Sequence, residues 1–162
     1  MPISVADPRH AHWLAEAVSD AVANVAAGGG PFAALVVQGE QVLGRGVNRV
    51  TADNDPTAHA EVVAIRDACR RLGDFRLDGC VLVSSCEPCP MCLGAALWAH
   101  LDRIVYAADR HDAAASGFDD RAFYRLFDTP REQWPVPVER VVVGDATAPF
   151  HAWRADPSRI DY

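Results

Sequence analysis

Apolar positions recur with a helical period in some stretches of the chain and form short, strand-like runs in others. Residues 7–30 repeat apolar side chains every three to four positions, which predicts a helix with one apolar face. Asp7 can cap this helix, Pro8 suits its first turn, and the glycines from Gly28 onward end it. The residues expected on the apolar face are Trp13, Leu14, Ala17, Val18, Ala21, Val22 and Val25.

Two apolar runs, at 32–38 and 41–48, flank Gly39 and Glu40, a pattern typical of two strands joined by a tight turn. The run at 80–85 is short, apolar and rich in β-branched residues, which predicts a buried strand. The same reasoning predicts strands at 103–108 and 138–144 and helices at 57–73, 90–100 and 146–156.

Strands joined through helices predict a mixed sheet that is covered by helices on both faces. The expected fold class is therefore α/β, as a three-layer α-β-α sandwich around a mixed five-stranded sheet. With 162 residues, the chain is long enough for one domain, 1–162, with a core of its own. Functional sites in such sheets form at the carboxyl ends of strands, where the following helices begin.

Composition and charge narrow the class of partner. The formal net charge is −7, and all fifteen basic residues are arginine, so a nucleic-acid partner is disfavoured because phosphate binding relies on cationic side chains. No apolar run is long enough to predict a membrane span, and the N-terminus lacks the pattern of a signal peptide. We therefore expect a cytoplasmic protein. Five cysteines, an odd number, argue against a disulfide framework there.

Two short motifs at predicted helix starts carry candidate metal ligands. His59 and Glu61 open one helix, and Cys89 and Cys92 open the next. The two cysteines are three positions apart, so they share a helix face, and a helix N-terminus favours their thiolate form. One imidazole and two thiolates give three protein ligands for tetrahedral Zn²⁺, and water can take the fourth position, as in catalytic sites.

Glu61 then has a role that does not require binding the metal. Zinc lowers the pKa of bound water to about 7, and a neighbouring carboxylate can pass the released proton to a substrate nitrogen. His-x-Glu followed by Pro-Cys-x-x-Cys is the signature typical of zinc-dependent deaminases.

The sequence alone also allows a second interpretation of the metal site. Cys86 offers a fourth sulfur, which would close the site as a structural Cys₃His centre but would leave Glu61 without a role. Cys69 and Cys80 lie in apolar elements and are expected in the core.

Longer strings in the chain are similar to one family. The chain resembles the cytidine-deaminase-fold superfamily and, within it, the bacterial guanine deaminases, nearly from end to end. The strings that carry this resemblance are GGPF at 29–32, NDPTAHAE at 54–61, SCEPCPMCLGA at 85–95, GFDD at 117–120, FHAWR at 150–154 and the terminal Tyr162.

The resemblance implies hydrolysis of guanine to xanthine and ammonia, in purine salvage, with a small purine base as substrate. His59, Cys89 and Cys92 would hold Zn²⁺, and Glu61 and Asp120 would be the catalytic residues. The substrate contacts that it implies are Asn48, Phe32, Asp120, Tyr162 and Ala60. Simpler alternatives remain open: a turn residue for Asn48, a helix cap for Asp119 or Asp120, a core ring for Phe32, and a frayed end for Tyr162.

The resemblance also implies a homodimer in which a C-terminal segment, about 145–162, is exchanged, so that Tyr162 closes over the partner's site. One position departs from the family, because Ala33 stands where a glycine commonly follows the Pro-Phe pair. Other substrates therefore stay open: cytosine or cytidine, a modified purine, a triazine, or the adenosine of a tRNA. A zinc-stabilised module without enzymatic activity is the remaining alternative.

Overall fold

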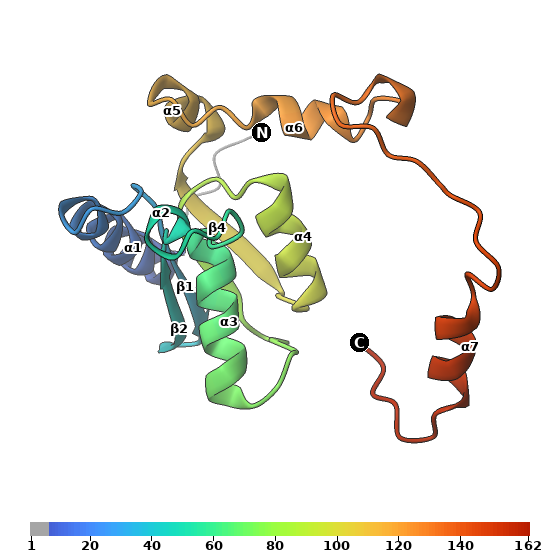
Figure 1. Cartoon of the computed structure of the whole chain (residues 1–162). Coiled ribbons are helices and arrows are strands. Elements are labelled where there is room, and N and C mark those ends of the chain that lie inside the picture. The colour runs from blue at the N-terminus through green and yellow to red at the C-terminus, as the bar shows by residue number, and fades with distance from the viewer. Residues whose placement is uncertain (1–6) are drawn as a thin grey trace. The chain divides into compact units, whose positions relative to one another are not determined.

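The computed structural model describes residues 7–162, which divide into two compact units. One unit extends to Tyr124 and the other runs from Arg125 to Tyr162. The first holds the sheet and most of the helices, drawn from blue to light orange in Figure 1. Its strands are β1 (Ala33–Gln38), β2 (Gln41–Val47), β3 (Val81–Cys86) and β4 (Arg103–Ala108). The helices are α1 (Pro8–Ala26), α2 (Val50–Asp53), α3 (Ala60–Leu72), α4 (Pro90–Trp98), α5 (Arg110–Ala115) and, at the boundary, α6 (Arg121–Leu126).

The strands form a mixed sheet in the order β2-β1-β3-β4. β1 runs antiparallel to β2 and β3, while β3 and β4 run parallel, as strands connected through a helix do. The hairpin of β1 and β2 turns at Gly39, whose φ of 59° suits a residue without a side chain. The mixed α/β sheet is thus as predicted.

The prediction of a fifth strand at 138–144 was wrong, because the described sheet has four strands. The valines of this segment are 48–89% exposed, and the segment belongs to no strand. A run of β-branched residues has the propensity for a strand, but a strand forms only where a neighbour offers its backbone N–H and C=O groups. No other described strand supplies that neighbour.

The two faces of β1 pack into two separate cores. Ala34 and Val36 join the core under α3 and α4, whereas Leu35 and Val37 join the core under α1. Successive side chains of a strand point to opposite faces, so an unbroken apolar run is what a strand buried on both sides requires. Helices on both faces give the three layers that the sequence predicted.

Helix α3 lies unusually close to β2. A Cβ atom on Gly46 would lie 2.1 Å from the carbonyl oxygen of Ala60, and one on Gly44 would lie 2.4 Å from that of Ala64. These two glycines therefore let the helix backbone touch the strand backbone. The contact at Ala60 sets the height of the first turn of α3 above the sheet.

Helix α1 begins as predicted, with the side chain of Asp7 accepting a hydrogen bond from the Arg9 N–H at 3.0 Å. The apolar face is only partly covered, because Ala17 and Ala21 are buried while Val18, Val22 and Val25 are exposed. These three valines border a groove of about 340 Å³ that reaches the end of β4 and α5.

The second unit contains a short 3₁₀ helix, η1 (Arg131–Gln133), and α7 (Ala148–Ala155), the helix expected at 146–156. Local contacts order it: the Trp134 indole N–H donates to the carbonyl of Thr129 at 3.0 Å, and Trp153 meets Tyr162 edge to face. Among the described residues, no helix combines the length and hydropathy needed to span a bilayer.

The close approach of α3 to β2 predicts a strong effect of one added methyl group. Gly46→Ala is expected to lower the free energy of unfolding by about 1–3 kcal/mol, because the methyl would overlap the Ala60 carbonyl and push α3 outward. Urea denaturation measures this loss. Gly94→Ala in α4 is the control: no atom lies within 4 Å of its added Cβ, so stability should be equal or higher. Equal stability of both variants would contradict the close packing.

Candidate active site and metal centre

Three potential metal ligands meet where α3 and α4 begin. His59 and Cys89 are the residues directly before the two helices, and Cys92 lies in the first turn of α4. The Sγ atom of Cys89 lies 3.5 Å from His59 Nδ1 and 3.5 Å from the Sγ of Cys92, which lies 3.6 Å from the same ring nitrogen. Tetrahedral zinc, with ligand bonds of 2.0–2.3 Å, holds its ligand atoms about 3.5–3.8 Å apart, so these residues fit Zn²⁺.

The electrostatics of the three groups also suit a cation. The contact with the Cys92 thiol, together with the His59 ring, lowers the pKa of Cys89 to about 4. That contact and burial raise the pKa of Cys92, which therefore needs a metal ion to stabilise its thiolate. The donor set of one imidazole and two cysteines leaves one tetrahedral position for water.

The closed structural site that Cys86 would create does not form. His59, Cys89 and Cys92 are grouped as potential ligands without Cys86, whose sulfur instead approaches the carbonyl oxygen of Asp109 at 3.7 Å. All five cysteines are free, as expected for a chain without a disulfide framework.

Glu61 lies beside the metal group without belonging to it. The side chain is 6% exposed, and the Ser84 hydroxyl donates to its Oε1 at 3.4 Å. Burial raises the pKa of Glu61 above its usual range, which brings this carboxyl closer to the pH at which an acid–base catalyst works.

A pocket of about 510 Å³ opens over these residues. Except for Cys92, every candidate site residue of the first unit lines it, although these residues come from five separate segments of the chain. Its polar and aromatic lining consists of Phe32, Asn48, Thr51, His59, Glu61, Glu87, Cys89, Arg110, Phe118, Asp119, Asp120 and Phe123. Ala60 also lines it, whereas Ala33 is buried within β1 and is absent from the lining.

Asn48 is oriented by residues that the sequence did not single out. The Asn24 amide donates to the backbone carbonyls of Gly30 at 2.8 Å and Asn48 at 3.0 Å. Gly30 leaves room for the Asn48 side chain, since a Cβ there would lie 2.9 Å from it. The Val50 N–H donates to Asn48 Oδ1 at 3.3 Å, which fixes the amide plane.

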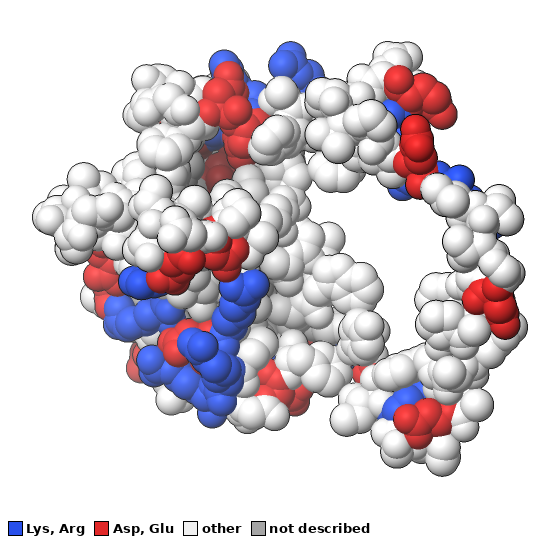
Figure 2. Space-filling view, in the orientation of Figure 1, with Lys and Arg blue, Asp and Glu red and all other residues white. Residues whose placement is uncertain are grey.

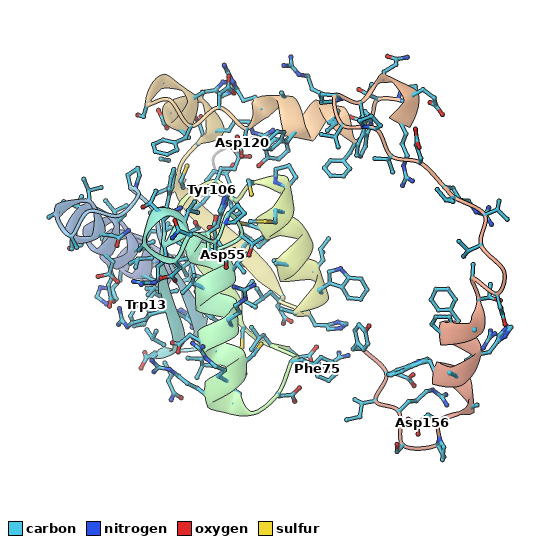
Figure 3. The ribbon with its side chains drawn as sticks, in the orientation of Figure 1. Trp13, Asp55, Phe75, Tyr106, Asp120 and Asp156 are labelled. Atoms are coloured by element: carbon cyan, nitrogen blue, oxygen red, sulfur yellow. The ribbon has the colours of Figure 1, made fainter. Side chains whose placement is uncertain are left out.

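The neighbouring residues Asp119 and Asp120 make different contacts. Asp119 accepts the backbone N–H of Arg121 at 3.2 Å and pairs with its guanidinium, so its side chain bonds to the first residue of α6. Asp120, labelled in Figure 3 on the segment between α5 and α6, has a buried Oδ1 with no hydrogen-bond partner in the described structure. Burial raises the pKa of Asp120. A buried oxygen without a hydrogen-bond partner indicates that this carboxyl group bonds to a ligand in the pocket.

Aromatic rings form one wall of the pocket. Phe32 meets Phe118 edge to face, with ring centroids 5.0 Å apart, and also packs against the core below α3. Tyr162 belongs to the other unit, so its predicted role in the site stays a prediction.

Several site residues were missed by sequence reasoning. Ser84 and Ser85 are buried, and the Ser85 hydroxyl accepts the Ala33 N–H at 3.1 Å. Two serines at the end of an apolar strand are the signal that could have revealed them. Arg110 and Tyr124, which contact the loop before Cys89, gave no sequence signal.

Two helix starts that present a His-Cys-Cys set beside a buried glutamate define a zinc-dependent hydrolytic deaminase. The "Cytidine and deoxycytidylate deaminase zinc-binding region" matches residues 8–108, more than half of the chain, so the chain belongs to this deaminase family.

Individual relatives extend the match beyond that region. The guanine deaminase of Bacillus subtilis (strain 168) is 47% identical over 94% of this chain and 99% of its own length. Its X-ray structure superposes with a TM-score of 0.91 over 94% of this chain and 98% of that chain. A guanine deaminase structure from Nitrosomonas europaea is 37% identical, with a TM-score of 0.64 over 74% and 69% of the two chains.

A relative with another activity is less similar. The tRNA-specific adenosine deaminase of Buchnera aphidicola subsp. Schizaphis graminum (strain Sg) is 34% identical over 73% of this chain and 78% of its own length.

The geometry of the ligand set predicts which sulfur is essential for zinc. Cys92→Ala is expected to lose most bound zinc, because it removes one of three protein ligands. Cys86→Ala, the matched control, is expected to keep about one zinc per chain, because its sulfur lies outside the group. Metal analysis after dialysis measures both. Equal zinc loss in the two variants would support the closed site instead.

Proposed function

We propose that this protein is a guanine deaminase of purine salvage, which converts guanine and water to xanthine and ammonia. The observation that carries the proposal is the near full-length identity of 47% with the Bacillus subtilis guanine deaminase. The pocket supports it, because a purine base is flat and small, and about 510 Å³ lies within the range of about 300–1,000 Å³ typical of small-molecule sites.

In the proposed reaction, zinc supplies Lewis-acid activation of water when it is bound. Glu61 accepts one proton of that water and delivers it to a ring nitrogen next to the reacting carbon. It then takes the remaining proton of the added oxygen and gives it to the leaving amine. The carbon gains an oxygen, the C–N bond to the exocyclic amine breaks, and ammonia leaves. The burial of Glu61 supports this part, because it raises the pKa of the carboxyl group toward the working pH, where one group can act first as base and then as acid.

The remaining pocket residues are proposed to bind the base. Asn48 presents its fixed amide to the purine edge, and the free oxygen of Asp120 accepts an N–H of the base or assists proton transfer. Phe32 packs on the flat ring, and Ala60 contacts it from the first turn of α3.

We also propose a cytoplasmic homodimer with segment 145–162 exchanged, so that Tyr162 closes the partner's pocket. Free cysteines suit a reducing compartment. Helix α4 carries no charged residue, in an uncharged area of Figure 2, and exposes Leu97 and Trp98 at 77% and 67%. Exposed apolar side chains on α4 and on α7, such as Phe150, are typical of surfaces that a second subunit covers.

The tRNA-specific adenosine deaminases are the second candidate, because they share the family and the ligand motif. The net charge of −7 disfavours this function, since tRNA binding depends on neutralising phosphates. The pocket residues do not distinguish guanine from the other candidate substrates, which are cytosine, cytidine, modified purines and triazines. Turnover assays distinguish them.

A panel of substrates tests the proposed activity. The zinc-loaded protein is expected to release ammonia from guanine, with xanthine as product, and much more slowly from cytosine, adenine, guanosine, cytidine and adenosine. Glu61→Gln should lower kcat by about 10²–10⁴-fold with zinc retained, because it removes the proton carrier. Glu40→Gln in the hairpin turn is the exposed control. The guanine assignment would be contradicted if the protein released no ammonia from guanine but released it from another compound of the panel or from a tRNA substrate.

Mixing two inactive chains tests the exchanged tail. One chain carries Glu61→Gln, and the other lacks Asp161 and Tyr162. If Tyr162 acts across the dimer, mixed dimers contain one complete site, and turnover should recover to about a quarter of the unmutated value after subunit exchange. No recovery in demonstrated mixed dimers, or full activity of the truncated chain by itself, would contradict the exchange.

A further inference from the structure

The loop that leads into Cys89 is held by a side chain from another element. Arg110, the first residue of α5, donates its backbone N–H and its Nε–H to Glu87 Oε2, each at 3.0 Å, and its Nη2 to Glu87 Oε1. The side chains are 13% exposed for Glu87 and 31% for Arg110. A planar guanidinium that bonds both oxygens of a largely covered carboxylate fixes the direction of that carboxylate.

A second contact holds the next residue of the same loop. The guanidinium carbon of Arg110 lies 3.6 Å from the ring centroid of Tyr124, and the Tyr124 hydroxyl donates to the carbonyl of Pro88. Glu87 is also tied by its own N–H to the carbonyl of Ala108 at 2.8 Å, at the end of β4. The two residues before Cys89 are thus restrained by two side chains that stack on each other.

The same tyrosine lies on the helix that follows Asp120. Phe123 N–H donates to the carbonyl of Asp120 at 2.9 Å, so Asp120 begins the turn that carries Tyr124. Since Asp120 Oδ1 has no hydrogen-bond partner in the described structure, its position depends on the backbone of this turn. Anchoring Tyr124 on Pro88 therefore also anchors Asp120 relative to Cys89.

We propose that Arg110 and Tyr124 form a clamp whose role is to position Cys89 at ligand distance from His59 and Asp120 at the pocket. Both are positioning residues in this proposal, because they act on the site through Glu87 and Pro88. The clamp rests on the proposed metal site but not on which base is deaminated. It requires an arginine, since a lysine offers neither the two-pronged contact with Glu87 nor the flat face for Tyr124.

Zinc retention tests the clamp. Arg110→Lys keeps the charge, and Tyr124→Phe keeps the ring but removes the hydroxyl that binds Pro88. Arg76→Lys is the matched control, because Arg76 makes a similar two-pronged pair with Asp78, at 2.8 and 3.0 Å, outside the pocket lining. Each zinc-loaded protein is mixed with an excess of a chromogenic chelator, well below its unfolding temperature, and the rate of zinc release is recorded.

Both clamp variants are expected to release zinc about 10–100-fold faster than the unmutated protein, the range typical when a residue that orients a metal ligand is changed. Arg76→Lys should release it at the unmutated rate. In excess zinc, the clamp variants should show a lower kcat, because Cys89 and Asp120 are displaced from the reacting atoms.

Release rates within twofold of the unmutated protein for both variants would overturn the clamp. So would a higher KM with unchanged zinc release in Arg110→Lys, because Arg110 lines the pocket and would then be a substrate contact. Circular dichroism and thermal unfolding confirm that each variant is folded at the temperature used. The release rates do not depend on guanine turnover, so failure of the guanine assignment and failure of the clamp give different results.

Discussion

The contact between the backbones of α3 and β2 is the constraint on which the site depends. Gly44 and Gly46 carry no side chains, so the helix rests directly on the strand, and its first turn is held at one height above the sheet. That turn presents His59 and Glu61. Cys89 and Cys92 reach them because β3 ends next to β1 in the same sheet, and α4 starts within a few residues of that end. The metal centre is therefore a consequence of sheet order and of one close helix–strand contact.

Around this centre, ionisable groups are buried in ways that a purely structural site would not require. Glu61 and Asp120 lie in the same pocket with raised pKa values, and burial is the main cause for both. Burying a carboxyl group is unfavourable unless it gains partners, yet Asp120 Oδ1 has none in the described structure. This pattern is typical of an enzyme in which the bound substrate supplies the missing hydrogen-bond partner.

Much of the organisation was predictable because its signals are local. Asp7, Gly39 and Gly73 act at turns and helix ends, where the backbone conformation is decided by the residue itself, so most element positions were right. The candidate ligands were recognisable for a related reason, since each lies within a short motif at a helix start. The fifth strand was not predictable, because Val141 and its neighbours have strand propensity but depend on a distant pairing partner.

The sequence by itself determined the two motifs, the alternation of strands and helices, and the class of chemistry that one histidine, two cysteines and a glutamate can perform. Tertiary structure decided that Asp119 bonds to the nearby Arg121, while Asp120 keeps an oxygen without a hydrogen-bond partner in the described structure. It also excluded Cys86 from the ligand group. It also placed Arg110 against Glu87 and Tyr124 against Pro88, in the loop before Cys89. These contacts join residues more than twenty positions apart, and no local pattern encodes them, because they arise only when separate elements pack around the same strand ends.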